Sequence, residues 1–579
     1  MKIIKKIFKF LDPSLKFSAL LLVVLIILNA FAETLTVALI IPIIFFLFEN
    51  NIIESYPKIF SVVELFSPFK YLGGEYSEKM LAISGLLMIF CFIVIIRIIF
   101  NIVFLYYKAS LELKTRYLLT KKLISGYFNF ENNNFFNKNN SSLAFSTINE
   151  TQHVSSCIGL LFVLIAEFFL LLSLFIILLI YQTKITIFLS IVIGISSIIF
   201  LIFFKKKINL FSVKRRVGEE ENMKQVNEMF DGLMEIKSYK ATEYFMKKYL
   251  INYKDYLENL RFSSVLPSLP KLWSEFISLV LITLLLSYML KNNFSQSMVI
   301  STLGLYVAAM FKLMPSINKI INAIQSIKYV EPILDNISSD IDALNKNFFV
   351  EEKDIQKIKM GSKIILSNIF YGYNESNLLL ENLSLTITKN HKIGITGKSG
   401  CGKSTLVKIL AGLIKPTKGK FIIDEKINIE GDYLNLENIS FVPQDVFIMS
   451  DSIKNNIGFG IDQNDIDDEK INYCIKKVQL DGLINSLSEG INHKLLENGK
   501  NLSGGQKQRI GIARALYYEP DILVFDESTS SLDLINEEQI LKLIKEICAN
   551  KTVIFVSHRK EVLDFCDTIY RIENKKIYV

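Results

Sequence analysis

Cysteine is scarce in this chain and forms no motif. Only six of the 579 residues are cysteines, and no two of them stand in a C-x-x-C pair. This spacing argues against a disulfide framework and against a zinc site. Cys401 lies inside a glycine-rich loop in the second half of the chain, so we expect that half to face a reducing cytosol.

A dense run of lysine and arginine is also missing. The formal net charge is +8, which is small for a chain of 579 residues. No segment is typical of an arm that binds nucleic acid, so we expect no nucleic-acid partner. The positive excess is better explained as a signal of membrane topology.

Long apolar runs, in contrast, are frequent, and they crowd into the first 325 residues. Hydrophobic residues make up 51% of the chain, and its mean hydropathy is +0.35. A helix needs about 20 apolar residues to cross a bilayer. The runs that meet this requirement predict six membrane-spanning helices, at residues 17–48, 80–107, 157–181, 185–204, 272–290 and 298–322.

The positions of the basic residues predict how these spans are oriented. Basic residues cluster at 205–216, after the fourth span, whereas the loop after the fifth span carries only Lys291. Because basic loops stay inside, we expect the N-terminus, the long segments 108–156 and 205–271, and the C-terminus in the cytoplasm.

The first external loop, residues 49–79, has apolar positions spaced by three and four. This pattern predicts an amphipathic helix on the outer membrane surface, and it fits a helix packed against the bundle equally well. The apolar positions are Ile52, Ile53, Tyr56, Ile59, Phe60, Val62, Val63 and Phe66.

Residues 397–404 read GKSGCGKS and match the phosphate-loop pattern G-x-x-x-x-G-K-[ST]. The loop follows an apolar run and precedes a helix-compatible one, so its backbone N–H groups would surround a polyphosphate at a helix N-terminus. We expect Lys403 to reach the β- and γ-phosphates of ATP and the Ser404 hydroxyl to bind Mg²⁺. The predicted nucleotide-binding loop comprises Gly397, Lys398, Ser399, Gly400, Cys401, Gly402, Lys403, Ser404 and Thr405.

Five further motifs follow in a fixed order: FVPQD at 441–445, LSGGQ at 502–506, ILVFDE at 522–527, SSLD at 530–533 and VSHR at 556–559. Together with the phosphate loop, this set resembles the ATP-binding cassette (ABC) transporters. Six spans followed by one cassette is similar to an exporter half-transporter of that family.

The resemblance implies a membrane α-helical bundle with the type IV ABC exporter fold, followed by an α/β P-loop nucleotide-binding domain. We accordingly expect a transmembrane domain at 1–325, a linker at 326–355 and a cassette at 356–579. The two long cytoplasmic segments are compatible with helices that project tens of ångströms from the bilayer. Each is expected to break, near 129–140 and 231–238, where it would contact the ATPase domain, although the asparagine-rich stretch at 129–140 equally fits a loose polar loop.

The resemblance also implies roles for single residues of the cassette. Asp526 would hold Mg²⁺, and Glu527 would act as general base on the attacking water. His558 would contact the γ-phosphate, Gln444 would bind the metal ion and link its site to the membrane domain, and Tyr373 would stack on adenine.

In the family, the LSGGQ segment caps the nucleotide bound to the other cassette. A complete site would then take two chains, which predicts a homodimer, while a related second half-transporter also fits the sequence. The residues that this resemblance adds to the ATP site are Ser503, Gly504, Gly505, Gln506 and Asp533.

Ionisable residues within the spans are costly in a membrane and therefore point to function. Four of them are cations, and Lys312 and Lys319 lie two turns apart on one helical face. We expect a cavity for an anionic group. The alternative is a set of internal ion pairs, such as Arg97 with Glu33 or Glu167, with lysines that reach the interface. The four predicted substrate-contacting cations are Arg97, Lys271, Lys312 and Lys319.

The membrane half is similar to bacterial lipid-linked oligosaccharide flippases of the protein N-glycosylation type. The resemblance rests on the Glu33–Thr34 pair, Arg97, the region 266–271 and the run LYVAAMFKLMPSINKII at 305–321. It implies a flippase for a lipid-linked oligosaccharide, or a similar anionic lipid, in the bacterial cytoplasmic (inner) membrane. Lysine stands at three of the four cationic positions and lacks the bidentate fork of arginine.

Two other functions remain compatible with the sequence. A multidrug or peptide exporter would have the same architecture. A cassette ATPase bound to nucleic acid or the ribosome would share the nucleotide motifs, but the six spans argue against it.

Overall fold

The computed structural model divides the chain into two compact units. We call the part that ends at Lys346 the helical unit and residues Asn347–Val579 the sheet unit. The structure describes the chain except for residues 1–5, 8, 41, 44–61, 72–75, 129–139, 266–267, 293, 295, 347–358, 375–376, 426, 431–433, 435, 437, 528–541 and 549.

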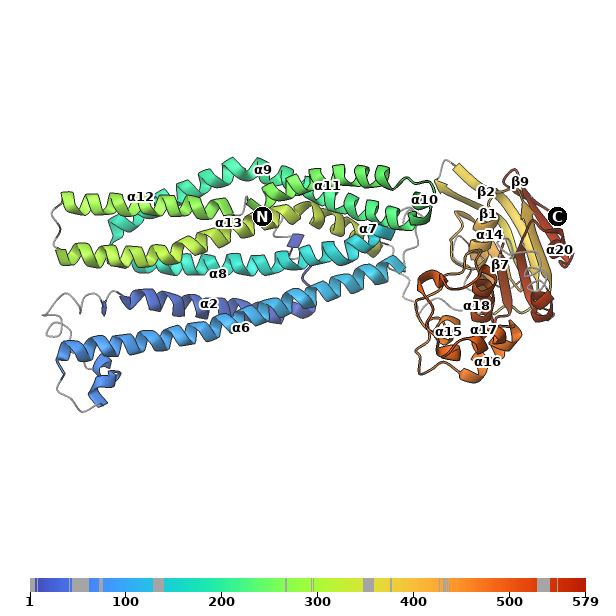
Figure 1. Cartoon of the computed structure of the whole chain (residues 1–579), viewed down its shortest axis with the longest axis horizontal. Helices are drawn as coiled ribbons and strands as arrows, with labels where there is room; N and C mark the ends of the chain where they lie inside the picture. Colours follow the sequence, from blue (N-terminus) through green and yellow to red (C-terminus); the bar gives the residue numbers. More distant parts are fainter. Residues whose placement is uncertain are drawn as a thin grey trace. The chain divides into compact units, whose positions relative to one another are not determined.

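The helical unit is built from long helices that run side by side (Figure 1). Helix α8 contacts α2, α6, α9 and α13, and α12 packs on α13. Short helical turns, η1 (Pro13–Leu15), η2 (Pro68–Tyr71), α7 (Asn140–Phe145) and η3 (Ser146–Glu150), join the long elements. The long helices, with the short α10, are α2 (Lys16–Ala38), α6 (Glu78–Phe128), α8 (Thr151–Tyr181), α9 (Thr183–Asp231), α10 (Leu233–Ser238), α11 (Thr242–Val265), α12 (Leu269–Lys291) and α13 (Gln296–Lys346).

Five helical stretches in the described part of the chain have the length and apolar composition to cross a membrane. They are Pro13–Ala38, Glu78–Phe128, Ser141–Tyr181, Thr183–Phe200 and Leu269–Lys291, and they overlap the first five predicted spans. The sixth predicted span, residues 298–322, lies within α13, which is not one of these five.

Helix α6 continues without a break through the predicted second span and beyond it. Its 51 residues correspond to roughly 75 Å at 1.5 Å per residue, more than twice the ~30 Å of a bilayer core. Helix α9 extends in the same way and ends at Asp231, where Gly232 caps it and α10 begins. The predicted break at 231–238 is therefore present, whereas the other, at 129–140, lies outside the described residues except for Asn140.

The predicted linker at 326–355 is wrong over its first part. Helix α13 continues to Lys346, and a stripe of its residues is buried among the helices of the helical unit. The apolar positions recur every three or four residues, which is the period of a helix packed on one face, and charged residues between them hid this period. The boundary with the sheet unit stays a prediction. The buried stripe is Ile327, Val330, Ile333, Leu334, Ile337 and Ile341.

The first external loop is described only from residue 62 onward. Val63 is buried in a small cluster with Ala82 and Leu86 of α6. A side chain at Gly85 would begin 2.1 Å from the Val63 carbonyl oxygen, so only glycine allows this close packing. The described part of the loop thus packs on the bundle. Ile52, Ile53, Tyr56, Ile59 and Phe60 lie outside the described residues.

The sheet unit contains two sheets. One is antiparallel, with strand order β2-β1-β4-β5, and the other has the order β10-β9-β3-β8-β7-β6, in which all strands but β10 run parallel. The strands are β1 (Lys363–Asn374), β2 (Asn377–Thr388), β3 (Lys392–Gly397), β4 (Lys418–Ile423), β5 (Ile427–Glu430), β6 (Ile439–Val442), β7 (Ile522–Asp526), β8 (Thr552–Val556), β9 (Thr568–Glu573) and β10 (Lys576–Tyr578).

Helices cover the parallel sheet because its central strands are apolar on both faces. In β7, Ile522 and Val524 face one core, which includes α14 and the antiparallel sheet, whereas Leu523 and Phe525 face a second core formed by α15, α16 and α18. The helices of the sheet unit that Figure 1 labels are α14 (Lys403–Leu410), α15 (Ile453–Ile457), α16 (Asp468–Lys477), α17 (Asp481–Ser486), α18 (Gly504–Tyr517) and α20 (Lys560–Leu563).

Asp424 ties the turn after β4 to the start of β1. Its carboxylate accepts hydrogen bonds from the backbone N–H groups of Gly361, Ser362 and Lys363 and from the Ser362 hydroxyl. Desolvation raises the pKa of Asp424, but these hydrogen bonds outweigh it and lower the pKa from 3.8 to about 2. The charged carboxylate is therefore the stabilising form.

We predict that Asp424→Asn lowers the stability of the sheet unit by about 1 kcal/mol at neutral pH, a value discounted for solvent exposure. Because the folded-state pKa is depressed, this contribution is complete above about pH 4 and disappears as the pH falls toward about 2. Thermal unfolding of the full chain in detergent, at pH 7 and pH 3, measures it.

Glu425→Gln is the matched control, because the adjacent Glu425 makes only an exposed ion pair with Lys363. A smaller change is expected for this variant. Equal losses for both variants at pH 7, or a loss for Asp424→Asn that is undiminished at pH 3, would contradict the assigned role of the Asp424 carboxylate.

Candidate functional site

The glycine-rich loop connects β3 to α14 in the conformation that its sequence predicts. Gly397, Gly400 and Gly402 have φ angles of +152°, +78° and +102°, which other residues rarely adopt. A Cβ at Gly397 would also lie 2.4 Å from the carbonyl oxygen of Ile572, so neither the backbone angle nor the space admits a side chain there. The loop is thus shaped to turn its backbone inward ahead of the α14 N-terminus.

Lys403 starts α14 and is almost fully buried, with a side chain that is 5% exposed. Its ammonium group donates hydrogen bonds to the carbonyl oxygens of Gly397 (2.9 Å) and Lys398 (3.1 Å). The cation therefore lies across the loop that it is predicted to serve. A polyphosphate held by the loop would replace these carbonyl oxygens as its partner.

Two of the three predicted metal ligands, Ser404 and Asp526, lie in direct contact. The Ser404 hydroxyl donates a hydrogen bond of 3.0 Å to Oδ1 of Asp526, which ends β7. Burial raises the pKa of Asp526, and the Ser404 hydrogen bond opposes this shift. A hydroxyl and a carboxylate are the oxygen ligands that Mg²⁺ prefers, so this pair fits the ion.

Glu527 follows Asp526 and lies between two positively charged or protonatable groups. Its Oε1 is 3.8 Å from Nζ of Lys403 and 3.6 Å from Nε2 of His558. The backbone of Glu527 has a φ of +44°, a strained value for a residue with a side chain. Its N–H donates to the carbonyl oxygen of Val556, the last residue of β8, which fixes the strained turn.

These residues meet because β3, β8 and β7 are adjacent and parallel. The carboxyl ends of parallel strands lie at the same edge of a sheet, where α/β proteins bind ligands. The glycine-rich loop follows β3, Glu527 follows β7, and His558 lies just after β8. The structure thereby brings together five predicted site residues from three separate motifs: Lys403, Ser404, Asp526, Glu527 and His558.

The LSGGQ segment forms the start of α18. Ser503 is the N-cap, and its hydroxyl accepts a hydrogen bond from the N–H of Gln506, whose side chain in turn accepts from the N–H of Ser503. This capping box fixes the first turn, in which Gly504 and Gly505 lie. The Gln506 side chain is therefore engaged within its own helix end.

Gln444 follows β6 and is connected to α18 through its backbone. Gln508, which is buried, donates a hydrogen bond of 2.7 Å from its side-chain amide to the carbonyl oxygen of Gln444. The sequence motifs did not point to Gln508. Its position on the apolar face of a helix could have indicated a buried, hydrogen-bonded glutamine. The metal-linking role of the Gln444 side chain stays a prediction.

Two residues predicted to bind ATP are less well placed. Tyr373 belongs to β1, but only its backbone is described. Asp533 lies outside the described residues. The roles of both in nucleotide binding stay predictions.

In the helical unit, each of the four predicted substrate cations lies near a carboxylate. Arg97 and Lys312 both approach Oε1 of Glu33, at 3.7 and 2.9 Å. Lys319 is 2.6 Å from Oε1 of the buried Glu167, and Lys271 is 4.0 Å from Glu275. This arrangement corresponds to the internal ion pairs that the sequence offered as the alternative to a cationic cavity. The sequence had not assigned the partners of Lys312 and Lys319. Pairing is expected where charges are removed from water.

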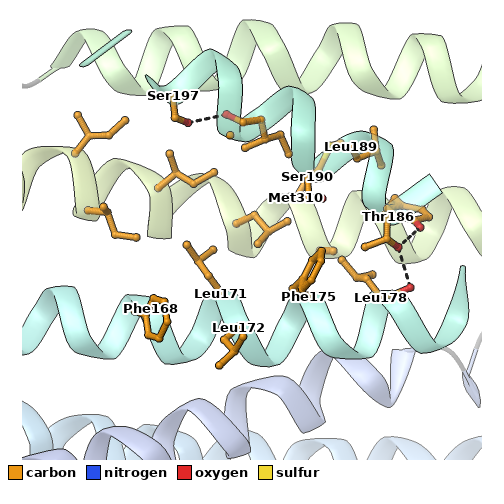
Figure 2. A pocket seen from close by; sticks show the side chains of 18 residues that line it. Phe168, Leu171, Leu172, Phe175, Leu178, Thr186, Leu189, Ser190, Ser197 and Met310 are labelled. Atoms are coloured by element: carbon orange, nitrogen blue, oxygen red, sulfur yellow. Dashed lines mark hydrogen bonds between the residues drawn. The ribbon is translucent and has the colours of Figure 1, made fainter. Parts of the chain in front are cut away.

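A cavity of about 440 Å³ lies between α8, α9 and α13, and Figure 2 shows the side chains that line it. None of the four predicted substrate cations is among the lining residues, which are almost all apolar. The four cations therefore do not line this cavity, and their contact with a substrate stays a prediction.

Comparison with known proteins agrees with this architecture. The ABC transporter transmembrane region matches residues 19–314, and the ABC transporter ATP-binding family, described as "ABC transporter", matches residues 380–530. A solved structure titled as a bacterial Atm1-family ABC exporter with ATP bound aligns with 98% of this chain and 95% of that chain, at a TM-score of 0.72 and 17% identity. The predicted exporter fold, a helical bundle followed by an α/β P-loop domain, is thereby confirmed.

Curated relatives match over shorter regions. ABC transporter B family member 29 of Arabidopsis thaliana, a chloroplastic protein, is 32% identical over 49% of this chain and 45% of its own length. The mitochondrial iron-sulfur clusters transporter atm1 of Aspergillus fumigatus is 33% identical over 39% of this chain and 32% of its own length. The chain thus spans less than half the length of these relatives. Because the match to the transmembrane region alone covers more than half of the 579 residues, the chain belongs to the ABC transporter family.

Proposed function

We propose that this chain is one half of a homodimeric ATP-driven exporter that moves an anionic lipid across the bacterial cytoplasmic membrane. The observation that carries the proposal is the contact between Ser404 and Asp526, with Glu527 adjacent, at the end of the glycine-rich loop. This arrangement supplies a metal-binding pair and a base at one edge of the sheet.

Ser404 and Asp526 are the residues that would hold Mg²⁺, and the bound ion would neutralise charge on the phosphate oxygens. Lys403 would exchange its two loop carbonyl oxygens for phosphate oxygens when ATP binds. Transfer of a phosphoryl group to water depends mainly on such positioning and charge stabilisation.

Glu527 is the proposed general base. Its carboxylate would accept a proton from the attacking water, and its strained backbone holds it directly beside the metal-binding Asp526. His558, 3.6 Å away, would contact the γ-phosphate from the β8 side. The proposal thus gives the roles of base, metal ligand and phosphate contact to different side chains.

The proposed site is completed by a second copy of the chain. Ser503, Gly504 and Gly505 present a helix N-terminus, which attracts anions, and α18 has 14 residues. In the proposed homodimer this end of α18 would cap the γ-phosphate bound to the partner subunit.

The proposed cargo is a lipid-linked oligosaccharide or a similar anionic lipid. Among the described residues, the three cations Arg97, Lys312 and Lys319 contact two carboxylates, Glu33 and Glu167, so this group of five charges is net positive. The side chains of Lys319 and Lys271 are 59% and 69% exposed and are accessible to an anionic headgroup. The neighbouring carboxylates offset the free-energy cost of removing these cations from water. The cations are therefore already stable at these positions when a pyrophosphate arrives to pair with them.

A multidrug or peptide exporter is the second candidate. It is favoured by the apolar lining of the cavity and by the pairing of Arg97 and Lys312 with Glu33, which lowers their attraction for an anion. The two candidates differ in whether charge on the cargo is required.

Glu527→Gln keeps the size of the side chain but removes the base. We predict that ATP still binds and that hydrolysis falls at least about a hundredfold, the scale of general base catalysis. Steady-state ATPase assays and nucleotide binding in proteoliposomes measure both quantities. Full hydrolysis by this variant would show that Glu527 is not the general base. Lys403→Ala provides the contrast, because it should weaken ATP binding itself.

Complementation between two inactive chains tests the shared site. Ser503→Arg and Glu527→Gln homodimers should each be inactive, whereas their mixture contains dimers in which one site has an intact base and an intact LSGGQ segment from different chains. We predict that mixing restores ATPase activity. Ser503→Asn preserves the helix cap and therefore controls for loss of the cap. A mixture that is as inactive as the two separate homodimers would exclude a site shared between chains.

The charge requirement is tested by removing one ion pair. Replacing Lys319 and Glu167 together by Gln avoids a buried unpaired carboxylate. We predict that transport of a lipid-linked pyrophosphoryl sugar falls about tenfold or more, the equivalent of one charged hydrogen bond. Lys184→Gln, at an exposed position of α9, is the matched control. Transport by the double variant at the wild-type rate would favour the multidrug candidate. Stimulation of the ATPase by neutral drugs alone would favour it as well.

A further inference from the structure

The cavity in the helical unit is lined by segments of three helices, and these segments lie within predicted membrane spans. Along α8 its lining extends from Phe168 to Leu178, which corresponds to about 15 Å of helix, or half of a bilayer core. An apolar cavity of about 150 Å³ in a soluble protein is large enough for one benzene ring. At about 440 Å³, this cavity has room for a longer hydrocarbon.

The hydroxyl groups in the lining already have their donor hydrogens engaged inside the protein. There are four such groups, and Figure 2 shows hydrogen bonds of Thr186 and Ser197. The Thr186 hydroxyl lies within hydrogen-bond distance of the carbonyl oxygens of Leu178 in α8 and Gln182 at the start of α9, and 2.8 Å from the Tyr306 hydroxyl. Ser190 and Ser197 donate to the carbonyl oxygens of Ile187 and Ile193. The described lining thus favours a purely hydrocarbon occupant.

Glycine keeps part of this space open. A Cβ built at Gly194 of α9 meets no atom within 4 Å, although the residue lines the cavity. A larger side chain at this position would therefore enter open space and reduce the volume of the cavity.

A polar pair lies close to the Phe168 end of the cavity. Glu167 is one turn before Leu171 on the same face of α8, and it binds Lys319 of α13 through Oε1. Its other oxygen, Oε2, is buried and has no hydrogen-bond partner among the residues that the structure describes. The exposed cation of Lys319 and a buried acceptor oxygen that lacks a donor therefore lie next to one end of the apolar space, outside its lining.

We propose that the cavity binds the hydrocarbon chain of the lipid-linked cargo, an inference that rests on the proposed function. A phosphate on the headgroup would pair with Lys319, and a sugar hydroxyl would donate to Oε2 of Glu167. An ordinary phospholipid without a donor group meets only the first of these requirements. The proposed occupant of the cavity is the hydrocarbon chain of the cargo. A bulk lipid chain and a helix of a second copy are the competing occupants.

Gly194→Leu tests the proposal by filling the cavity from α9. Transport would be measured in proteoliposomes with two probes that share a pyrophosphoryl N-acetylglucosamine headgroup, one on a long polyprenyl chain and one on a chain of two isoprene units. The variant should raise the KM for the long probe about tenfold, since displacing two methylene groups costs about 1.6 kcal/mol, and leave the KM for the short probe nearly unchanged. Gly194→Ala should give a smaller shift in the same direction.

Ile198→Phe is the matched control, because Ile198 is exposed on the same helix and does not line the cavity. It should change neither KM. A KM for the long probe that is unchanged in Gly194→Leu, or an equal rise for both probes, would overturn the proposal.

Photolabelling separates this proposal from the proposed function. A diazirine-bearing polyprenyl pyrophosphoryl sugar should label α8 and α13 of wild type, weakly label Gly194→Leu, and be displaced by the unlabelled long probe. This binding result stands even if wild type transports neither probe, which would defeat the proposed function alone. Equal labelling by a diazirine phosphatidylcholine that the cargo does not displace would assign the cavity to bulk lipid. A changed oligomer mass of Gly194→Leu in light scattering would assign it to the second copy.

Discussion

The hydrogen bond between Ser404 and Asp526 connects two loops that are 122 residues apart in sequence. It exists because β3 and β7 flank β8 in one parallel sheet, so that the residues after each strand meet at one edge. Both loops require backbone angles that the sheet must stabilise: positive φ at the glycines of residues 397–402 and at Glu527. The nucleotide site therefore depends on the packing of the strands that hold it, and strain at Glu527 is tolerated because the surrounding core fixes the chain.

In the helical unit the corresponding constraint is the cost of charge in a low-dielectric environment. Glu33 and Glu167 join α2, α6, α8 and α13 through contacts with Arg97, Lys312 and Lys319. Removing one partner of such a contact leaves an uncompensated charge, so the cations are stable only with their carboxylates. None of these charged residues lines the cavity between α8, α9 and α13, whose walls are almost all apolar.

The two units thus use charge in different ways. In the sheet unit, Lys403, Asp526 and Glu527 converge within a small space at the edge of the sheet, where a phosphate and a metal ion would complete their pairing. In the helical unit, the charges already pair with one another, and an anionic headgroup would have to compete for Lys319 with Glu167. The first arrangement is suited to chemistry, and the second to binding and release.

The sequence alone determined the exporter fold and the nucleotide loop, because glycine spacing, apolar runs of membrane length and the order of the motifs are local properties of the chain. It did not reveal that residues 326–346 continue α13, since charged residues interrupt the apolar period that packing completes. It also did not identify Glu33 as a partner of Lys312 or Glu167 as a partner of Lys319. Only the tertiary structure decided these pairings, because a salt bridge such as Lys319 with Glu167 joins residues 152 positions apart, and which helices lie close enough to share charge depends on how the whole bundle packs.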